Sequence, residues 1–158
     1  MILISDINYY LAACLILFSY LVGSISFGIL IAKFMNLGNL RALGSGNIGA
    51  TNVLRTGNKL AAALTLILDS GKGYLVVYTT IFLFENSYIP FSGIAVFLGH
   101  IFPIYHKFKG GKGVATFLGI ILAMNLKVGI MVCITWLVVA LVSKKSSITA
   151  LICSTAAP

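Results

Sequence analysis

The stretch YYLAACLILFSYLVGSISFGILIAKF, residues 9–34, decides the fold class of this 158-residue chain. Lys33 is its only charged residue, and apolar side chains fill most of the other positions. A helix that crosses a bilayer needs about 20 mostly apolar residues, and a longer stretch is accommodated by tilting. We therefore expect one tilted transmembrane helix here and a protein embedded in lipid.

Further apolar runs follow along the chain. They cover residues 60–84, 91–105 and 114–142, and another begins near residue 148. The chain thus predicts an all-α, polytopic transmembrane helix bundle with six segments, of which the last is incomplete, and with the N-terminus outside. We expect residues 1–158 to form a single transmembrane domain.

The run at 114–142 is long enough for one helix, but Asn125 and Lys127 interrupt it. Lys and Arg collect in the cytoplasmic loops of membrane proteins. A single helix would place Lys144 and Lys145 outside, whereas two short helices return them to the cytoplasm. We therefore expect two helices that turn near residues 125–127.

Composition agrees with a membrane location. Hydrophobic residues make up 59% of the chain and charged residues 9%, against about 25% charged in soluble domains. The net charge of +8 fits basic cytoplasmic loops, so we expect a lipid bilayer and no nucleic acid as the partner. The three cysteines have no CxxC spacing, which indicates no metal site.

A polar loop at residues 35–59 contains the sequence GSGNIGATNVLR at 44–55. Small residues let backbone N–H groups face an anion, and Arg55 has a guanidinium that binds phosphate through paired hydrogen bonds. A flexible connector is the alternative. The spacing Gly44-x-Gly46-x-x-Gly49 also matches a dinucleotide motif, but that motif follows a strand, whereas this loop follows a membrane segment.

A second polar loop reads KGGKG at residues 109–113. Its glycines predict exposed backbone N–H groups, and Lys109 and Lys112 add positive charge, which suits phosphate. It is not a Walker A motif, because Gly113 stands where Ser or Thr must follow the lysine. A membrane-surface anchor and a phosphate site are equally compatible with this loop.

Three titratable residues interrupt the apolar runs. Asp69 and Lys72 have helical spacing and can pair, and charges inside a membrane segment are costly. A structural pair and a functional role both remain open for them, and the glycines at 71 and 73 indicate a local helix irregularity. His100 is isolated from other metal ligands.

We expect no paired-carboxylate catalysis, because two of the three acids, Asp6 and Glu85, are expected on the far side of the membrane. The chemistry that remains is electrostatic. Arg, Lys and backbone N–H groups would hold phosphates and stabilise developing charge.

Four motifs occur in an order that resembles the acyl-phosphate:glycerol-3-phosphate acyltransferases of the bacterial inner membrane. They are GSISFG at 23–28, GSGNIGATNVLR at 44–55, DSGKG at 69–73 and GHIFPIYHKFKGGKGVAT at 99–116. The resemblance implies transfer of an acyl group from acyl phosphate to the 1-hydroxyl of glycerol 3-phosphate, without a cofactor. It also implies a multi-pass protein of the inner membrane with active-site loops on the cytoplasmic face.

The resemblance also implies roles for individual residues. The catalytic residues that contact phosphate would be Ser45, Arg55 and Lys112. The substrate-binding residues would be Gly44, Gly46, Asn47, Gly49, Thr51, Asn52, Lys109, Gly110, Gly111, Gly113, Ser146 and Ser147. Support would come from Asp69, Lys72 and His100. Family members continue to a seventh helix and a cytoplasmic tail that this chain lacks, so we expect weak activity from these 158 residues.

A small transporter for a phosphorylated or anionic solute is the rival class of function. Its binding groups would cluster at mid-membrane on broken helices. Here most polar residues lie in loops predicted on one face, which favours an enzyme.

Overall fold

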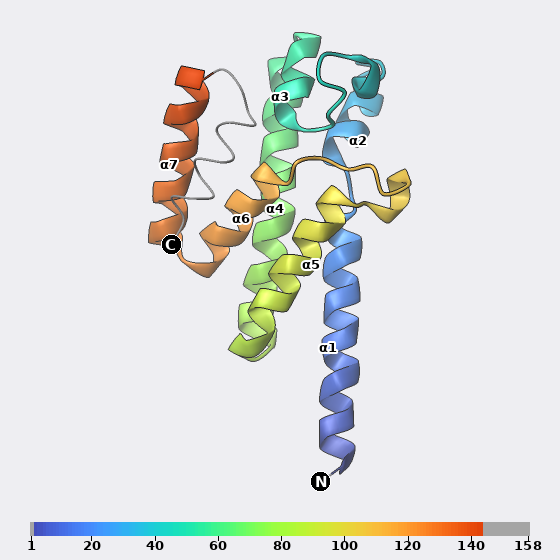
Figure 1. Ribbon diagram of the computed structural model, residues 1–158, viewed down its shortest axis with the longest axis vertical. Coiled ribbons are helices and arrows are strands. Elements are labelled where there is room, and N and C mark those ends of the chain that lie inside the picture. Colours follow the sequence, from blue (N-terminus) through green and yellow to red (C-terminus); the bar gives the residue numbers. More distant parts are fainter. Residues whose placement is uncertain (1, 144–158) are drawn as a thin grey trace.

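The computed structural model describes residues 2–143, with side chains for residues 9–140, and every regular element in that range is a helix (Figure 1). The α-helices are α1 (Ile2–Gly23), α2 (Phe27–Phe34), α3 (Ala50–Val53), α4 (Lys59–Leu83), α5 (Ile89–Ile101), α6 (Val114–Met124) and α7 (Leu126–Ser143). The 3₁₀ helices are η1 (Leu40–Ala42), η2 (Leu54–Thr56), η3 (Asn86–Tyr88) and η4 (Ile104–His106). The segment expected from residue 148 lies outside the described residues.

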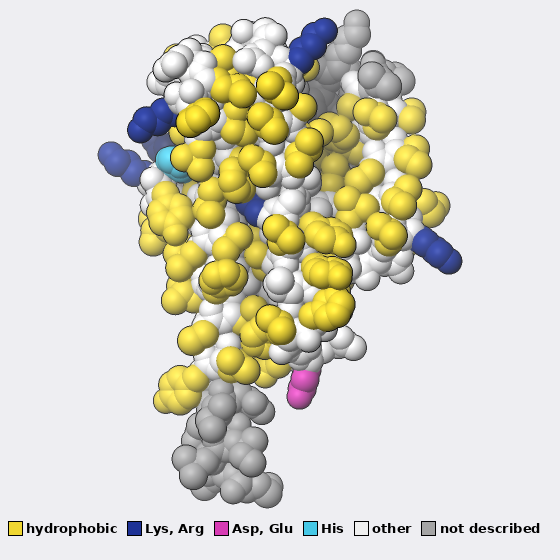
Figure 2. Space-filling model, turned by 180° about the vertical axis from the view of Figure 1, so that it is seen from behind, with side chains coloured by type: hydrophobic (Ala, Val, Ile, Leu, Met, Phe, Trp, Pro, Cys, Tyr) yellow, Lys and Arg dark blue, Asp and Glu magenta, His cyan; other side chains and the backbone are white. Residues whose placement is uncertain are grey.

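Within the described residues, three segments are long and apolar enough to cross a membrane, namely Tyr9–Phe34, Lys59–Leu83 and Asn86–His106. Figure 2 shows hydrophobic side chains over most of one face of the molecule, and large apolar residues such as Phe82 are 70% exposed. Exposed apolar surface of this extent requires lipid rather than water around it. The predicted all-α membrane fold is confirmed, while the position of the N-terminus outside stays a prediction.

The apolar run at 9–34 is one candidate membrane span, as expected, but it forms two helices rather than one. The chain leaves helical geometry at residues 24–26, between α1 and α2. Ser24 turns its hydroxyl back to the carbonyl oxygen of Tyr20 at 2.9 Å, and the carbonyl of Ile25 accepts a bond from Lys72 Nζ at 2.6 Å. The Lys72 side chain therefore satisfies the Ile25 carbonyl, which the interruption leaves without a helical donor, as the membrane interior requires.

Helix α4 is continuous through residues 69–73, so the expected irregularity was also wrong. Gly73 instead permits close packing against α6. A Cβ atom at this position would lie 2.4 Å from the carbonyl oxygen of Thr116. Small residues at such contacts let membrane helices approach each other closely.

The turn predicted near residues 125–127 is confirmed at Asn125, between α6 and α7. The Asn125 side-chain oxygen accepts the backbone N–H groups of Lys127 at 3.1 Å and of Val128 at 3.2 Å. It thereby caps the first turn of α7, which is a typical role for Asn at a helix start. The two helices form a hairpin, and α7 runs back toward the end of the molecule that holds α3 (Figure 1).

The first and second polar loops lie against each other, although almost 70 residues separate them. The guanidinium of Arg41 donates to the backbone carbonyl of Lys109. In Figure 1 both loops lie in the half of the bundle opposite the N-terminus, whereas the α4–α5 and α6–α7 connections lie toward the other end. The fold thus places the two candidate phosphate-binding loops together.

Candidate active site

A cavity of about 480 Å³ opens between the polar loops and the helices α4, α6 and α7. Its polar lining comes from Asn47, Gly49, Thr51, Lys59, Asp69, His100, Lys112 and Gly113. Its apolar lining includes Leu54, Ala62, Ala63, Leu66, Val114, Ala115, Trp136, Leu137 and Ala140. The cavity therefore has the amphipathic lining that suits a ligand with a phosphate and an alkyl chain.

Lys112 and the start of α6 form the cationic wall of this cavity. Gly113 has a left-handed φ of +78° directly before α6, and a Cβ there would lie 2.4 Å from the Phe97 ring. Val114 and Ala115 in the first helical turn also line the cavity. Backbone N–H groups in the first turn have no acceptor within the helix, and together with the helix dipole they attract anions. Lys112 adds a full positive charge to this wall.

The second polar loop, residues 109–113, is called the glycine loop below. Two of its backbone N–H groups donate to carbonyls of the protein itself. Gly110 donates to the carbonyl oxygen of Ile101 at 3.0 Å, and Gly111 donates to that of His100 at 3.1 Å. These carbonyls belong to the last turn of α5, where backbone acceptors have no helical partner. The expectation that all the glycines of this loop expose their backbone N–H groups was therefore wrong for Gly110 and Gly111. Lys109 is exposed and does not line the cavity.

Asn52 holds the first loop in its shape. It is 1% exposed, and its side-chain nitrogen donates to the carbonyls of Leu40 at 2.8 Å and Asn47 at 2.7 Å. Its side-chain oxygen accepts the backbone N–H of Ser45 at 3.2 Å and faces Arg55 Nη1 at 3.5 Å. Both amide N–H groups are thus engaged within the protein, so Asn52 positions the loop rather than offering those donors to a substrate.

Ser45 and Arg55 lie together but outside the cavity that Lys112 lines. Both contact the Asn52 side-chain oxygen, and both are exposed. Gly44 makes this possible, because a Cβ there would lie 2.4 Å from Arg55 Nη1, and its φ of +54° favours glycine. Of the three expected catalytic residues, Ser45 and Arg55 therefore lie beside the cavity, and Lys112 lies in its wall.

The three buried titratable residues form one cluster. Lys72 Nζ lies 3.0 Å from Asp69 Oδ1, which confirms the predicted pair. His100 Nδ1 lies 3.6 Å from the same oxygen, and none of the three side chains is more than 4% exposed. The other ring nitrogen of His100 faces the glycine loop, since a Cβ at Gly111 would lie 2.3 Å from Nε2. Asp69 and His100 also line the cavity, so the cluster supports its floor.

The sequence analysis did not assign the apolar lining of the cavity to the site, and it also missed two lining residues that carry polar groups, Lys59 and Trp136. Lys59 was counted only as a loop cation, although its place in the basic loop was a usable signal. Trp136 gave no signal, because α7 is apolar on all sides. In the described part of the chain, its buried indole nitrogen has no hydrogen-bond partner. Ser146 and Ser147 lie outside the described residues.

No group of three or more metal-ligating side chains occurs among the described residues.

A family model described as glycerol-3-phosphate acyltransferase matches residues 13–158. The chain is 52% identical over 142 residues to the glycerol-3-phosphate acyltransferase of Jannaschia sp. (strain CCS1), covering 90% of this chain and 70% of the relative. It is 54% identical over 138 residues to that of Roseobacter denitrificans, covering 87% and 69%.

Two solved structures are similar to this fold. Both are crystal structures of PlsY, an integral membrane glycerol 3-phosphate acyltransferase. The glycerol 3-phosphate form superimposes with a TM-score of 0.86 at 38% identity, covering 92% of this chain and 74% of that chain. The lysophosphatidic acid form gives 0.82 at 36% identity, covering 92% and 73%.

Proposed function

We propose that this chain, which belongs to the glycerol-3-phosphate acyltransferase family, takes its acyl group from an acyl phosphate. In this reaction the 1-hydroxyl oxygen of glycerol 3-phosphate attacks the acyl carbonyl carbon. The bond from that carbon to the phosphate oxygen breaks, and lysophosphatidic acid and inorganic phosphate leave. Inorganic phosphate or the phosphate of glycerol 3-phosphate accepts the hydroxyl proton.

The observation that supports this donor is the lining of the 480 Å³ cavity. Lys112 and the first turn of α6 would hold the phosphate of the donor. The apolar residues of α4 and α7, among them Leu66 and Leu137, would contact the first part of its acyl chain. An acyl phosphate places its phosphate directly on the reacting carbonyl, so a single cavity with one cationic wall and one apolar wall fits it.

The same residues would lower the energy of the transition state. Negative charge develops on the carbonyl oxygen and on the departing phosphate, and preorganised donors such as Lys112 stabilise it. Ser45 and Arg55, which contact a common Asn52 oxygen, would hold the phosphate of glycerol 3-phosphate beside the cavity. The glycines of both loops let the backbone approach these phosphates.

We further propose that the loops face the cytoplasm across a bacterial inner membrane. Lys33, Arg41, Arg55 and Lys59 lie in or beside the first loop, and Lys107, Lys109 and Lys112 lie in or beside the second. Exposed Glu85 lies in the α4–α5 connection, toward the other end. This asymmetry follows the positive-inside tendency.

Phosphate release from defined substrates tests the donor. The chain, purified in neutral detergent, is given glycerol 3-phosphate with palmitoyl phosphate, palmitoyl-CoA or palmitoyl-acyl carrier protein. We expect equal amounts of inorganic phosphate and lysophosphatidic acid from palmitoyl phosphate, and little product from the other two donors. Comparable lysophosphatidic acid from palmitoyl-CoA would refute the proposed donor. Uptake of labelled glycerol 3-phosphate into proteoliposomes without any product would favour a transporter.

A further inference from the structure

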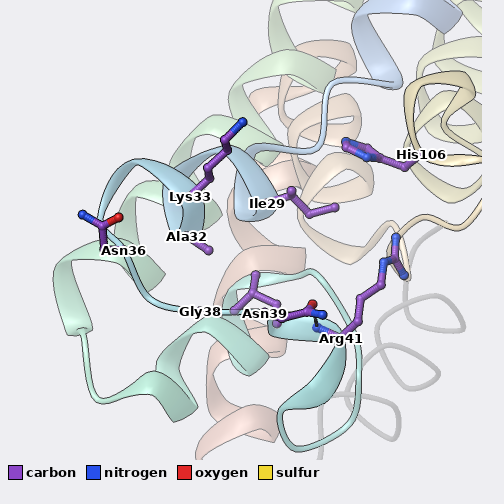
Figure 3. Close-up of a pocket in the computed structure, with 9 residues that line it drawn as sticks. Ile29, Ala32, Lys33, Asn36, Gly38, Asn39, Arg41 and His106 are labelled. Carbon is purple, nitrogen blue, oxygen red and sulfur yellow. Dashed lines mark hydrogen bonds between the residues drawn. The ribbon is translucent and has the colours of Figure 1, made fainter.

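We propose that a second cavity, formed by α2, η1 and η4, binds the phosphate group of an anionic membrane lipid. This cavity has a volume of about 620 Å³ and is drawn in Figure 3. Its lining shares no residue with the active-site cavity. The proposal concerns a separate site and does not depend on the identity of the acyl donor.

Three cationic or basic side chains from three elements converge on this cavity. Lys33 comes from the last turn of α2, Arg41 from η1 and His106 from η4. In Figure 3 the guanidinium of Arg41 points toward the His106 ring, and Ile29 lies between that ring and Lys33. None of the lining residues is acidic, so the cavity concentrates positive charge without neutralising it.

Two amides complete the polar lining. Asn36 and Asn39 lie on the segment that joins α2 to η1. Asn36 adopts a left-handed φ of 54°. A phosphate oxygen accepts hydrogen bonds from ammonium, guanidinium, imidazole and amide N–H donors alike. The lining therefore matches the headgroup of an anionic lipid in both charge and hydrogen bonding.

Apolar side chains beside the cavity indicate that its ligand comes from the membrane. Leu30 and Phe34 on α2 are 49% and 89% exposed, and Ile104 and Tyr105 on η4 are 48% and 58% exposed. Such residues lie in lipid, while adjacent Lys and Arg side chains reach the headgroups. Basic pockets at this level of a helix bundle bind anionic headgroups.

The site is also connected to the active-site loops. Arg41 lines the lipid cavity and at the same time donates to the carbonyl of Lys109, the first residue of the glycine loop. A phosphate that draws the Arg41 guanidinium toward itself competes with this contact. Replacing Arg41 would disturb the glycine loop as well as the lipid cavity, so the binding test replaces other residues.

Native mass spectrometry of the purified whole chain in neutral detergent tests the site. The probes are dioctanoyl phosphatidylglycerol, dioctanoyl phosphatidylcholine and inorganic phosphate. We expect the anionic lipid to bind more tightly than the zwitterionic one. The double variant Lys33→Gln/His106→Gln should bind phosphatidylglycerol about tenfold more weakly, because it loses the Lys33 ammonium and the His106 imidazole N–H as donors to phosphate.

Matched variants keep the test specific. Lys107→Gln removes the same charge from an exposed neighbour that does not line the cavity, and Lys112→Ala alters only the active-site cavity. Both should bind phosphatidylglycerol as the unmodified chain does. The single variant Lys33→Gln, at an exposed helix end, should show a smaller loss with an unchanged circular dichroism spectrum.

The proposal is overturned if the double variant binds phosphatidylglycerol normally, or if Lys107→Gln weakens binding equally, which would indicate a general effect of surface charge. Displacement of the lipid by inorganic phosphate at similar concentration would assign the cavity to a soluble phosphate and refute the lipid.

Discussion

The ammonium nitrogen of Lys72 lies 2.6 Å from the carbonyl oxygen of Ile25, at the interruption between α1 and α2. The same nitrogen lies 3.0 Å from the carboxylate of Asp69. One buried cation thus both neutralises an acid inside the bundle and satisfies a carbonyl that helix geometry leaves without a partner. Lys72 on α4 therefore stabilises the break in the first membrane segment, and the Ile25 carbonyl at that break gives this buried cation an acceptor.

Replacing Lys72 should destabilise the fold strongly. Lys72→Met removes the lysine partner of buried Asp69 and leaves only the His100 ring, at 3.6 Å. Breaking a buried ion pair by removing one partner typically costs about 3–5 kcal/mol. We expect a clearly lower midpoint when loss of the helical circular dichroism signal is followed on heating in detergent. The double variant Lys72→Met/Asp69→Leu should recover part of this loss, because no isolated charge remains. Lys127→Met, at an exposed cation, is the control, and equal stability of Lys72→Met and Lys127→Met would contradict the argument.

Lys112 and Arg55 should dominate turnover. Removal of a strong, preorganised donor lowers the rate by about 10²-fold or more, so we expect losses of this size for Lys112→Ala and for Arg55→Ala in the phosphate-release assay. Lys109→Ala is the matched control, because its side chain does not line the cavity and only its carbonyl contacts Arg41. Near-normal rates for both variants would indicate that these loops only anchor the protein at the membrane surface.

Gly111 should tolerate no side chain while His100 is present. A Cβ at Gly111 would lie 2.3 Å from His100 Nε2, so Gly111→Ala must displace the glycine loop and with it Lys112. A small displacement of a catalytic group costs about 10²-fold in rate. Gly71→Ala is the control, because a Cβ there meets no atom within 4 Å. If the clash is the cause, adding His100→Ala to Gly111→Ala should restore part of the activity, whereas a further loss would argue against it.

Replacing Trp136 should weaken the binding of the acyl donor and leave the binding of glycerol 3-phosphate unchanged. Its side chain lies in the apolar wall of the cavity. Trp136→Ala should therefore raise the KM for acyl phosphate several-fold and leave the KM for glycerol 3-phosphate unchanged. Val138→Ala, two residues along α7 and 53% exposed, should change neither value. An equal rise in both KM values for Trp136→Ala would indicate a general disturbance of α7 instead.

Cysteine labelling should place both loops on one side of the membrane. In a chain whose native cysteines are replaced by alanine, Asn39→Cys and Lys107→Cys should resist an impermeant thiol reagent applied to intact cells. Glu85→Cys should react, because it lies in a connection toward the other end of the bundle. Labelling of Asn39→Cys or Lys107→Cys would place their loop outside and contradict the proposed orientation.

The sequence by itself determined the fold class and the family. The length of an apolar run and the position of Asn125 are local properties, so they predicted membrane helices and the α6–α7 hairpin directly. The motifs at 44–55 and 99–116 were long enough to indicate the acyltransferase family, which the comparisons confirmed.

Only the tertiary structure decided which groups are available for chemistry. Asn52 and Gly110 carry suitable donors, yet their N–H groups bond to carbonyls of Leu40, Asn47 and Ile101. Trp136 joins the cavity only because the α6–α7 hairpin brings it opposite the first loop. Hydrogen-bond partners and cavity walls come from residues far apart in the chain, and no local pattern of residue types specifies such contacts.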